Sequence, residues 1–350
     1  MNRGSPFPFS RRPRDSVIHP PAPAAPPQLS LNAAAIAALS SLRSNPAAYA
    51  AALHNRGGVT VVDCGVATAG STELGLLMAR AALGDRGKPT LFAAEEDNCL
   101  RRDWPDCPWP IIGVTSDDPV AACLAAQYAG WKIADNDYFA MASGPIRAAI
   151  GREELYETIG RRERPEAVVG LLEASSLPPE TICTNLARLA HVPPESVLLL
   201  VAATASPAGT VQVVARSLET ALHQLFEHQF DLERIVRGTA AAPLPPVADN
   251  DLAAIGRTND AILYGGVVQL EVTGDDDSLK KIGPCAVSRS SAAHGRLFCE
   301  LFQEAGGDFY ALDPGLFAPA VLEFTNLDTG CRHRFGGLEP TLVATSFGGR

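Results

Sequence analysis

The sequence lacks a long hydrophobic run and an excess of positive charge. Its most apolar stretch, residues 197–205, is strand-sized and far shorter than the roughly 18 residues of a membrane-spanning helix. The formal net charge is −10, which leaves no broad basic face to neutralise nucleic-acid phosphates. Hydrophobic residues still make up 46% of the 350 positions, enough for a substantial core. We therefore expect a globular, cytoplasmic protein without membrane or nucleic-acid partners.

Residue spacings that would signal a metal or nucleotide site are also missing. The two closest of the eight cysteines, Cys99 and Cys107, lie eight positions apart, so no CxxC pair exists. The seven histidines form no HxH or HExxH motif. The glycine pairs fit neither a Rossmann nor a P-loop fingerprint, and no GxSxG elbow is present. We predict no metal site and no bound cofactor, and we expect the cysteines to be reduced and mostly buried.

The chain divides into a short tail and a long body. Residues 1–28 are rich in proline and arginine and are expected to form an extended, disordered tail. Residues 29–350 carry apolar strand-like runs between helical patterns, which predicts a mixed α/β fold. Strands are expected at residues 59–63, 110–115, 196–202 and 262–273. Helices are expected at residues 30–54 (two short ones), 73–83, 118–129, 145–159, 178–190 and 211–229.

The most informative segment for chemistry spans residues 211–225. On a helix, its valines and leucines share one face, whereas Arg216, Glu219, Thr220, His223 and Glu227 gather on the other. Arg216 and Glu219 are three residues apart and can touch. The pair could be a solvated surface ion pair. Alternatively, it could be a carboxylate positioned by a guanidinium at a pocket wall, where Glu219 could act as a base.

A second segment combines a helix start with aromatic residues. Ser116 or Asp117 can cap a helix that begins near Pro119. Tyr128 and Trp131 then fall near the end of that helix. They could be ordinary core aromatics or a flat wall for a planar heterocycle.

Two further polar segments are candidates for substrate binding. Ser143 and Gly144 precede a predicted helix, and Arg147 adds a positive charge one step further in, so this segment could hold an anion or could be a plain helix start. Asn259 and Asp260 lie in a polar stretch just before a predicted strand, which we interpret as a loop at a strand end. A turn rich in Asn and Asp is the alternative.

Taken together, these segments make the chain similar to the methenyltetrahydromethanopterin cyclohydrolase family over residues 29–347. The resemblance rests on Asp63-Cys-Gly-Val66 with Gly70-Ser71, Ser116-Asp-Asp-Pro119, Cys123-Leu-Ala-Ala-Gln-Tyr-Ala-Gly-Trp131, Ala142-Ser-Gly-Pro145, Ala215-Arg-Ser-Leu-Glu-Thr-Ala-Leu-His223, Gly256-Arg-Thr-Asn-Asp-Ala261, Tyr264-Gly-Gly266, Asp308-Phe-Tyr310, Asp313-Pro314 and Leu316-Phe-Ala-Pro-Ala320. Residues 74–86 and Ala293-His-Gly295 depart from the family pattern. No counterpart of the proline-rich tail is identified.

The resemblance implies a fold, a reaction and a set of site residues. The expected fold has two α/β lobes that face each other across a deep pocket, in a homo-oligomer that is a trimer in archaeal members. The expected reaction is hydrolysis of 5,10-methenyltetrahydromethanopterin to 5-formyltetrahydromethanopterin in one-carbon metabolism, without a metal. Arg216 and Glu219 match the family's catalytic pair. The residues expected to bind substrate are Ser71, Ser116, Asp117, Ser143, Gly144, Arg147, Asn259 and Asp260.

Two other functions remain open at this point. A homologue could bind or scaffold the pterin without catalysis, although both members of the catalytic pair are present. A folate-type cyclohydrolase and dehydrogenase would need a nicotinamide-binding glycine fingerprint, which the sequence lacks.

Overall fold

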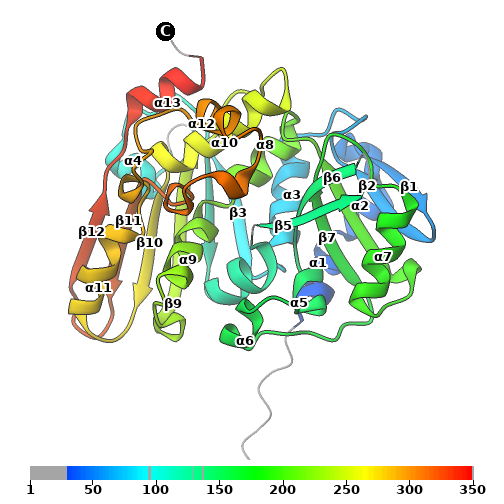
Figure 1. The fold of residues 1–350 in the computed structure, drawn as a ribbon, viewed down its shortest axis with the longest axis horizontal. Helices are drawn as coiled ribbons and strands as arrows, with labels where there is room; N and C mark the ends of the chain where they lie inside the picture. Colours follow the sequence, from blue (N-terminus) through cyan, green and yellow to red (C-terminus); the bar gives the residue numbers. More distant parts are fainter. Residues whose placement is uncertain (1–29, 94–95, 129, 136–137, 349–350) are drawn as a thin grey trace, which may run out of the picture.

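Two six-stranded mixed sheets stand side by side, each covered by helices (Figure 1). The computed structural model describes residues 30–93, 96–128, 130–135 and 138–348, so the predicted tail lies outside the described residues. The mixed α/β class and the two lobes predicted from the sequence are confirmed. Among the described residues, no helix is both long and apolar enough to cross a membrane.

The first sheet has the strand order β1–β2–β8–β7–β6–β5. Strand β8 runs parallel to its neighbours β2 and β7, and the other pairs are antiparallel. The carboxyl ends of β2, β8 and β7 therefore meet at one edge of the sheet. The strands span Ala52–Arg56 (β1), Val59–Asp63 (β2), Trp131–Asp135 (β5), Tyr138–Ser143 (β6), Val168–Glu173 (β7) and Val197–Ala202 (β8).

The second sheet has the strand order β12–β11–β10–β9–β4–β3. Only β10 and β11 pair in parallel. The chain builds β1 and β2 in the first sheet, β3 and β4 in the second, β5 to β8 in the first and β9 to β12 in the second. The strands span Gly87–Phe92 (β3), Ile111–Ser116 (β4), Ile235–Pro243 (β9), Val267–Val272 (β10), Val321–Asn326 (β11) and Arg332–Gly336 (β12).

Helices cover the sheets and fill the space between them. Helix α7 packs on β1 and β2, α1 and α3 pack on β7, and α8 packs on α3; α9 and α10 pack on β9 of the second sheet. The α-helices span Leu31–Ala38 (α1), Ser40–Ser44 (α2), Thr72–Ala82 (α3), Cys99–Asp103 (α4), Ile146–Ile150 (α5), Leu155–Ile159 (α6), Glu180–Ala190 (α7), Pro207–Val214 (α8), Ser217–Glu227 (α9), Asp251–Gly265 (α10), Asp276–Ile282 (α11), Phe298–Glu304 (α12) and Pro340–Ser346 (α13). Residues Val120–Gln127 (η2) wind as a π-helix, and η7 is a short 3-10 turn at Phe309–Ala311.

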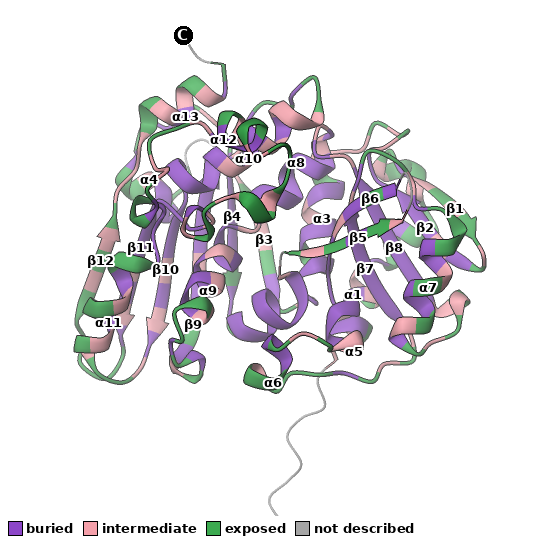
Figure 2. Ribbon diagram, in the orientation of Figure 1, coloured by how far each residue is buried: buried purple, intermediate pink, exposed green. Residues whose placement is uncertain are grey.

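Strand β8 shows why the first sheet forms where it does. Every residue of its apolar run is buried, as the purple central strands in Figure 2 illustrate. Leu199 and Val201 pack in the core on the α7 side, whereas Leu198 and Leu200 pack in the core on the α1 and α3 side. A continuous hydrophobic run therefore suits this strand, because both of its faces are covered.

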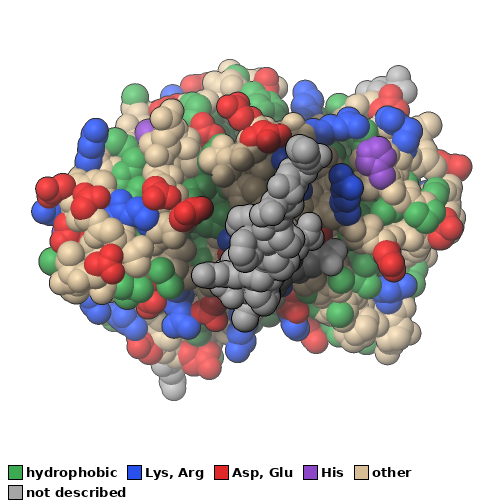
Figure 3. All heavy atoms as spheres, turned by 90° about the horizontal axis from the view of Figure 1, so that it is seen from below, with side chains coloured by type: hydrophobic (Ala, Val, Ile, Leu, Met, Phe, Trp, Pro, Cys, Tyr) green, Lys and Arg blue, Asp and Glu red, His purple; other side chains and the backbone are tan. Residues whose placement is uncertain are grey.

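The surface agrees with the charge pattern of the sequence. On the face shown in Figure 3, acidic and basic side chains are interspersed across the described surface. That face offers no broad basic patch among the side chains visible there, as expected for a net charge of −10.

The structure corrects five of the predicted elements. The helix predicted over residues 145–159 is two short helices, α5 and α6, with residues 151–154 between them. Residues 52–54, the end of the stretch predicted as helical, belong to strand β1. The predicted helix over 211–229 is two helices, α8 and α9, which are separated at Ala215 and Arg216. The strand predicted from residue 262 begins only at Val267, because residues 251–265 form helix α10. The predicted loop that carries Asn259 and Asp260 is therefore part of this helix.

Candidate active site

A pocket of about 420 Å³ lies between the two lobes. Strands β6 and β7 contribute from the first sheet, and helices α8, α9 and α10 contribute from the region between and beside the sheets (Figure 1). Its polar and aromatic lining comprises Tyr128, Ser143, Glu173, Gln212, Arg216, Glu219, Thr220, His223, Glu227, Asn259, Phe309, Tyr310 and Phe317.

Arg216 and Glu219 stand at the break between α8 and α9. Arg216 precedes the first residue of α9, and Glu219 lies in its first turn. The guanidinium Nε is 3.6 Å from Glu219 Oε2, and the two side chains are only 12% and 1% exposed. Arg216 Nη2 also donates a hydrogen bond of 2.6 Å to the carbonyl of Gln127, at the end of the π-helix. The interpretation as a solvated surface ion pair is therefore wrong, because Glu219 is buried and Arg216 is largely buried at the pocket wall.

The helical-wheel prediction describes α9 well. Leu218, Leu222 and Leu225 on one face are fully buried in the core of the second sheet. All five polar residues predicted to share the opposite face line the pocket. Tertiary packing thus uses the apolar side of α9 to direct its polar side into the pocket.

His223 occupies the middle of that polar face. Its Nδ1 lies 4.0 Å from Glu219 Oε1, and its Nε2 lies 3.6 Å from Glu227 Oε1. The ring of Tyr128 packs against the imidazole with centroids 4.9 Å apart. The histidine therefore lies between a buried carboxylate and an exposed one.

Glu173 is a pocket carboxylate that the sequence analysis missed. It ends strand β7, accepts a hydrogen bond from Thr204 Oγ1 and one of 3.4 Å from Gln212 Nε2, and keeps part of its surface open to the pocket. Desolvation raises the pKa of Glu173 above its ordinary value, although Thr204, Arg216 and Gln212 act in the opposite direction. An available signal was its place directly after an apolar run, the same pattern that marks Asp63.

Aromatic side chains form part of the pocket wall. Tyr128 from the end of the π-helix, Phe309 and Tyr310 from η7, and Phe317 all line it. Trp131, the other aromatic residue singled out in the sequence, instead lies in β5 and packs against the core on the α7 side. Flat apolar faces of this kind suit a planar ring system.

Two of the eight predicted substrate-binding residues line the pocket. They are Ser143, at the end of β6, and Asn259. The Asn259 side chain donates a hydrogen bond of 2.8 Å to the carbonyl of Ile255, one turn earlier in α10. The remaining six do not belong to its lining, and the structure gives most of them partners within the protein. These six are Ser71, Ser116, Asp117, Gly144, Arg147 and Asp260.

Ser71, Ser116 and Asp117 have local roles in this structure. Ser71 caps α3 by accepting from the amide of Leu74. The Ser116 hydroxyl donates a hydrogen bond of 2.7 Å to the carbonyl of Arg86. The exposed Asp117 carboxylate forms an ion pair of 2.7 Å with Arg237. At the helix start near Pro119, Ser116 Oγ accepts from the amide of Asp118 at 3.1 Å, and Asp118 Oδ1 accepts from the amide of Ala121 at 3.3 Å.

Two of the donors of the predicted anion site, the Gly144 amide and the Arg147 guanidinium, already bind groups of the protein itself. The Gly144 amide donates 2.9 Å to the carbonyl of Ala126. The buried Arg147 guanidinium pairs with Glu153 and lies over the Tyr128 ring, 4.9 Å from its centroid. The geometry therefore favours a role for Arg147 in holding Tyr128 at the pocket wall rather than in binding an anion.

Asp260 points away from the pocket, into the packing of α10 against α12 and α13. Its carboxylate accepts from the amide of Phe298 at 2.9 Å and from Ser346 Oγ at 2.6 Å. Burial raises the pKa of Asp260 to about 7, although these two hydrogen bonds act to lower it. Its contacts indicate a role in attaching the C-terminal helix.

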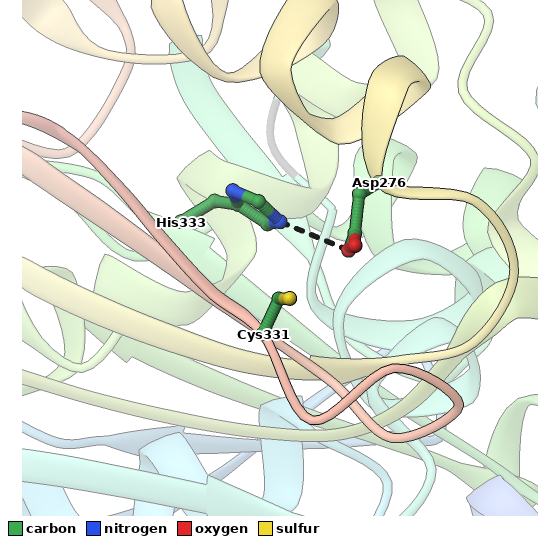
Figure 4. Close-up of side chains that lie close together, drawn as sticks. All are labelled: Asp276, Cys331 and His333. Atoms are coloured by element: carbon green, nitrogen blue, oxygen red, sulfur yellow. Dashed lines mark hydrogen bonds and ion pairs between the residues drawn. The ribbon is translucent and has the colours of Figure 1, made fainter.

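One cluster among the described residues has side chains of the metal-binding type, remote from the pocket lining. Figure 4 shows Asp276 at the start of α11 opposite Cys331 and His333. The ligand atoms of these three side chains lie within 4.8 Å of one another. Asp276 Oδ1 already accepts from His333 Nε2 at 2.9 Å, Asn326 Nδ2 at 2.7 Å and Thr329 Oγ1 at 3.1 Å. These bonds tie α11 to the β11–β12 turn.

The charges of the pocket favour a cationic ligand. Its lining contains three carboxylates, those of Glu173, Glu219 and Glu227, and one guanidinium, that of Arg216. A buried carboxylate held by a guanidinium can take a proton from water. The fold and site therefore define a two-lobed α/β protein with an acidic, aromatic pocket between its lobes.

Comparison with known proteins identifies the family. The family model described as cyclohydrolase (MCH) matches residues 30–347, and the chain belongs to this family. Proteins named methenyltetrahydromethanopterin cyclohydrolase are similar to it across most of their length. The one from Methylobacillus flagellatus is 40% identical over 291 residues, covering 83% of this chain and 86% of the relative. Those from Methylobacterium sp. (strain 4-46) and Methanosarcina barkeri are 42% and 40% identical over 296 residues, each covering 83% of this chain and 89% of the relative.

Proposed function

We propose that this protein hydrolyses 5,10-methenyltetrahydromethanopterin to 5-formyltetrahydromethanopterin in one-carbon metabolism. The observation that carries the proposal is the buried Arg216–Glu219 pair at the wall of an acidic, aromatic pocket. Membership of the cyclohydrolase family and the names of its relatives support the choice of substrate.

Glu219 is the proposed general base. The methenyl bridge is an amidinium-like cation, so its carbon is electrophilic without a Lewis acid or a bound cofactor. Water attack then requires a group that accepts a proton from the attacking water and holds the oxygen of that water in line with the carbon. Glu219 does both in this proposal, and the proton it takes can protonate N10 when the bond between carbon and N10 breaks.

Arg216 is the proposed orienting group. Its hydrogen bond to the Gln127 carbonyl fixes the guanidinium beside the carboxylate of Glu219, which is only 1% exposed. Arg216 is also a cation close to the site of a cationic substrate. The carboxylates of Glu173, Glu219 and Glu227 offset that repulsion.

The pair is tested by comparing the wild type with Glu219→Gln. We expect turnover, followed as loss of methenyl absorbance, to fall by on the order of a thousandfold, because Gln keeps the shape of the side chain but accepts no proton. Binding of the pterin, measured by calorimetry, should persist. Glu233→Gln, at an exposed carboxylate outside the pocket, is the matched control and should behave as the wild type.

The same assay separates the alternatives. A wild-type protein that binds the methanopterin compound without converting it would be a non-catalytic pterin-binding homologue. Faster conversion of methenyltetrahydrofolate would assign the folate substrate instead. Near-normal turnover by Glu219→Gln would overturn the assignment of the base. The homotrimer implied by the resemblance remains a prediction, and light scattering on the full-length protein checks it.

A further inference from the structure

The proposed reaction produces one net proton that has to leave the pocket. The methenyl substrate carries one positive charge that the formyl product lacks, and the attacking water brings two hydrogens. Glu219 takes the first of these from the attacking water and returns it to N10 as the ring opens, and the ionised Glu219 then takes the second from the new carbonyl oxygen. Glu219, the proposed acceptor, is only 1% exposed, so it has little direct contact with bulk water.

We propose that His223 and Glu227 form a proton relay that carries this proton from Glu219 along helix α9 to solvent. The inference rests on the proposed function and adds two residues to it. Because His223 and Glu227 act through Glu219, they are positioned for proton transfer and not for attack on the substrate.

The spacing along α9 places the three groups in line. Residues 219, 223 and 227 are four apart, so they share one helix face. Their side-chain exposure rises from 1% for Glu219 to 23% for His223 and 49% for Glu227. The order of the chain is therefore also the order from the protein interior to the surface.

The imidazole faces one carboxylate with each of its nitrogens. Nδ1 lies 4.0 Å from Glu219 Oε1, and Nε2 lies 3.6 Å from Glu227 Oε1. Gaps of this size are longer than direct hydrogen bonds, and a small rotation of the ring closes them. Because the two ring nitrogens are distinct, histidine can accept a proton on one side and release one on the other.

The groups packed against His223 help to hold it in this place. The Tyr128 ring lies 4.9 Å from the imidazole, and its hydroxyl donates to Glu227 Oε1 at 3.5 Å. Burial raises the pKa of Tyr128, so the phenol stays a neutral donor at physiological pH. The other charged groups nearby are Arg147, across the Tyr128 ring, and Arg216, beside Glu219.

The transfer balances without any further reactant. Protonated Glu219 passes its proton to Nδ1 of neutral His223, and the proton on Nε2 passes to Glu227 or to water. Glu219 returns to its ionised form. The ring then carries its proton on the other nitrogen and regains its first tautomer by turning or by exchange with solvent.

The relay is tested with full-length His223→Gln and Glu227→Gln in weak and in strong buffer. We expect kcat of His223→Gln to fall by about 10- to 100-fold in weak buffer with little change in KM, because proton export becomes limiting. Added imidazole, which diffuses into the pocket, should restore kcat several-fold. Glu227→Gln should lose less, because water can also accept the proton from Nε2. His228→Gln, an exposed histidine at the end of the same helix, is the matched control and should equal the wild type.

Each outcome decides between distinct conclusions. A wild-type kcat for His223→Gln in weak buffer would overturn the relay and leave the proposed function intact. A loss that imidazole does not restore, with a raised KM, would also overturn it and indicate a packing role. Absence of turnover in the wild type itself would overturn the proposed function, and the relay with it.

Discussion

Asp63 and Glu173 occupy equivalent places in the fold and have opposite surroundings. Each is the last residue of a strand that pairs in parallel with β8, so the two carboxylates stand at the same edge of the first sheet. Asp63 is buried, whereas Glu173 keeps part of its surface open to the pocket. The comparison shows that parallel pairing with β8 places both carboxylates at one edge of the sheet. The hydrogen-bond partners of each carboxylate then determine whether it stabilises the fold or faces a ligand.

The partners of Asp63 are the backbone of its own loop. Oδ1 accepts from the amides of Gly65 and Val66, and Oδ2 accepts from those of Ala67 and Thr68. Burial acts to raise the pKa of Asp63, yet these bonds outweigh it and lower the pKa. Asp63 is thus a structural anion that shapes the loop, while Glu173, with two side-chain partners, remains available to a ligand.

Removing Asp63 should have the largest effect in this comparison. Asp63→Ala leaves four loop amides without their acceptor, so we expect the free energy of unfolding to fall by on the order of 3 kcal/mol. Chemical denaturation measures it. Asp277→Ala, at a surface carboxylate paired with Lys280, should change stability very little and serves as the control. If Asp63→Ala proved as stable as the control, the loop would not depend on this carboxylate.

Glu173→Gln should show the reverse pattern. Gln cannot carry the negative charge that faces the pocket, so we expect kcat/KM to fall by about tenfold, which corresponds to about 1.4 kcal/mol. Stability should not decrease, because the fold disfavours the charged form of Glu173. Kinetics and denaturation are measured on the same preparation, with Glu195→Gln at an exposed site as the control. Lost stability with unchanged kinetics would make Glu173 structural, like Asp63.

The pH dependence of stability should separate the two residues by sign, with the smallest effect of the three. The pKa of Asp63 is lower in the folded state, so its stabilisation is present above its ordinary value of 3.8 and is lost as pH falls through the folded value. The pKa of Glu173 is higher in the folded state, so its contribution is greatest below 4.5 and is lost as pH rises through the folded value. Denaturation curves of Asp63→Asn and Glu173→Gln against pH should therefore deviate from the wild type in opposite directions. Deviations of the same sign would contradict the assigned shifts.

The sequence predicted best those features that follow from local hydrophobic pattern. The buried strands at residues 59–63 and 196–202 were visible as short continuous apolar runs, and the two faces of α9 were visible from the helical period of its apolar residues. The break between α8 and α9 could not be seen in the sequence, because nothing in residues 211–229 disfavours a helix. In the structure, Arg216 at this break donates a hydrogen bond to the carbonyl of Gln127, which lies 89 residues away in the chain.

Helix α10 was missed for a different reason. Its polar residues 257–260 look like a loop when taken alone, yet Asn250 caps the helix by accepting from the amide of Ala253. That cap could have been found in the sequence. The pocket position of Glu173 could not be worked out from its own strand, because it depends on the other lobe, which closes the pocket over it.

The alternation of the chain between the two sheets has a consequence for how the protein folds. Each lobe is assembled from two separate stretches of chain, one before and one after a stretch that belongs to the other lobe. Neither lobe can therefore be expressed as one continuous fragment, and native contacts must form between distant segments before either core is complete. Such a topology favours slow folding. It also favours cooperative unfolding, in which both lobes are lost together. Because the pocket lies between the lobes, unfolding of either lobe is expected to dismantle the pocket wall at which Arg216 and Glu219 lie.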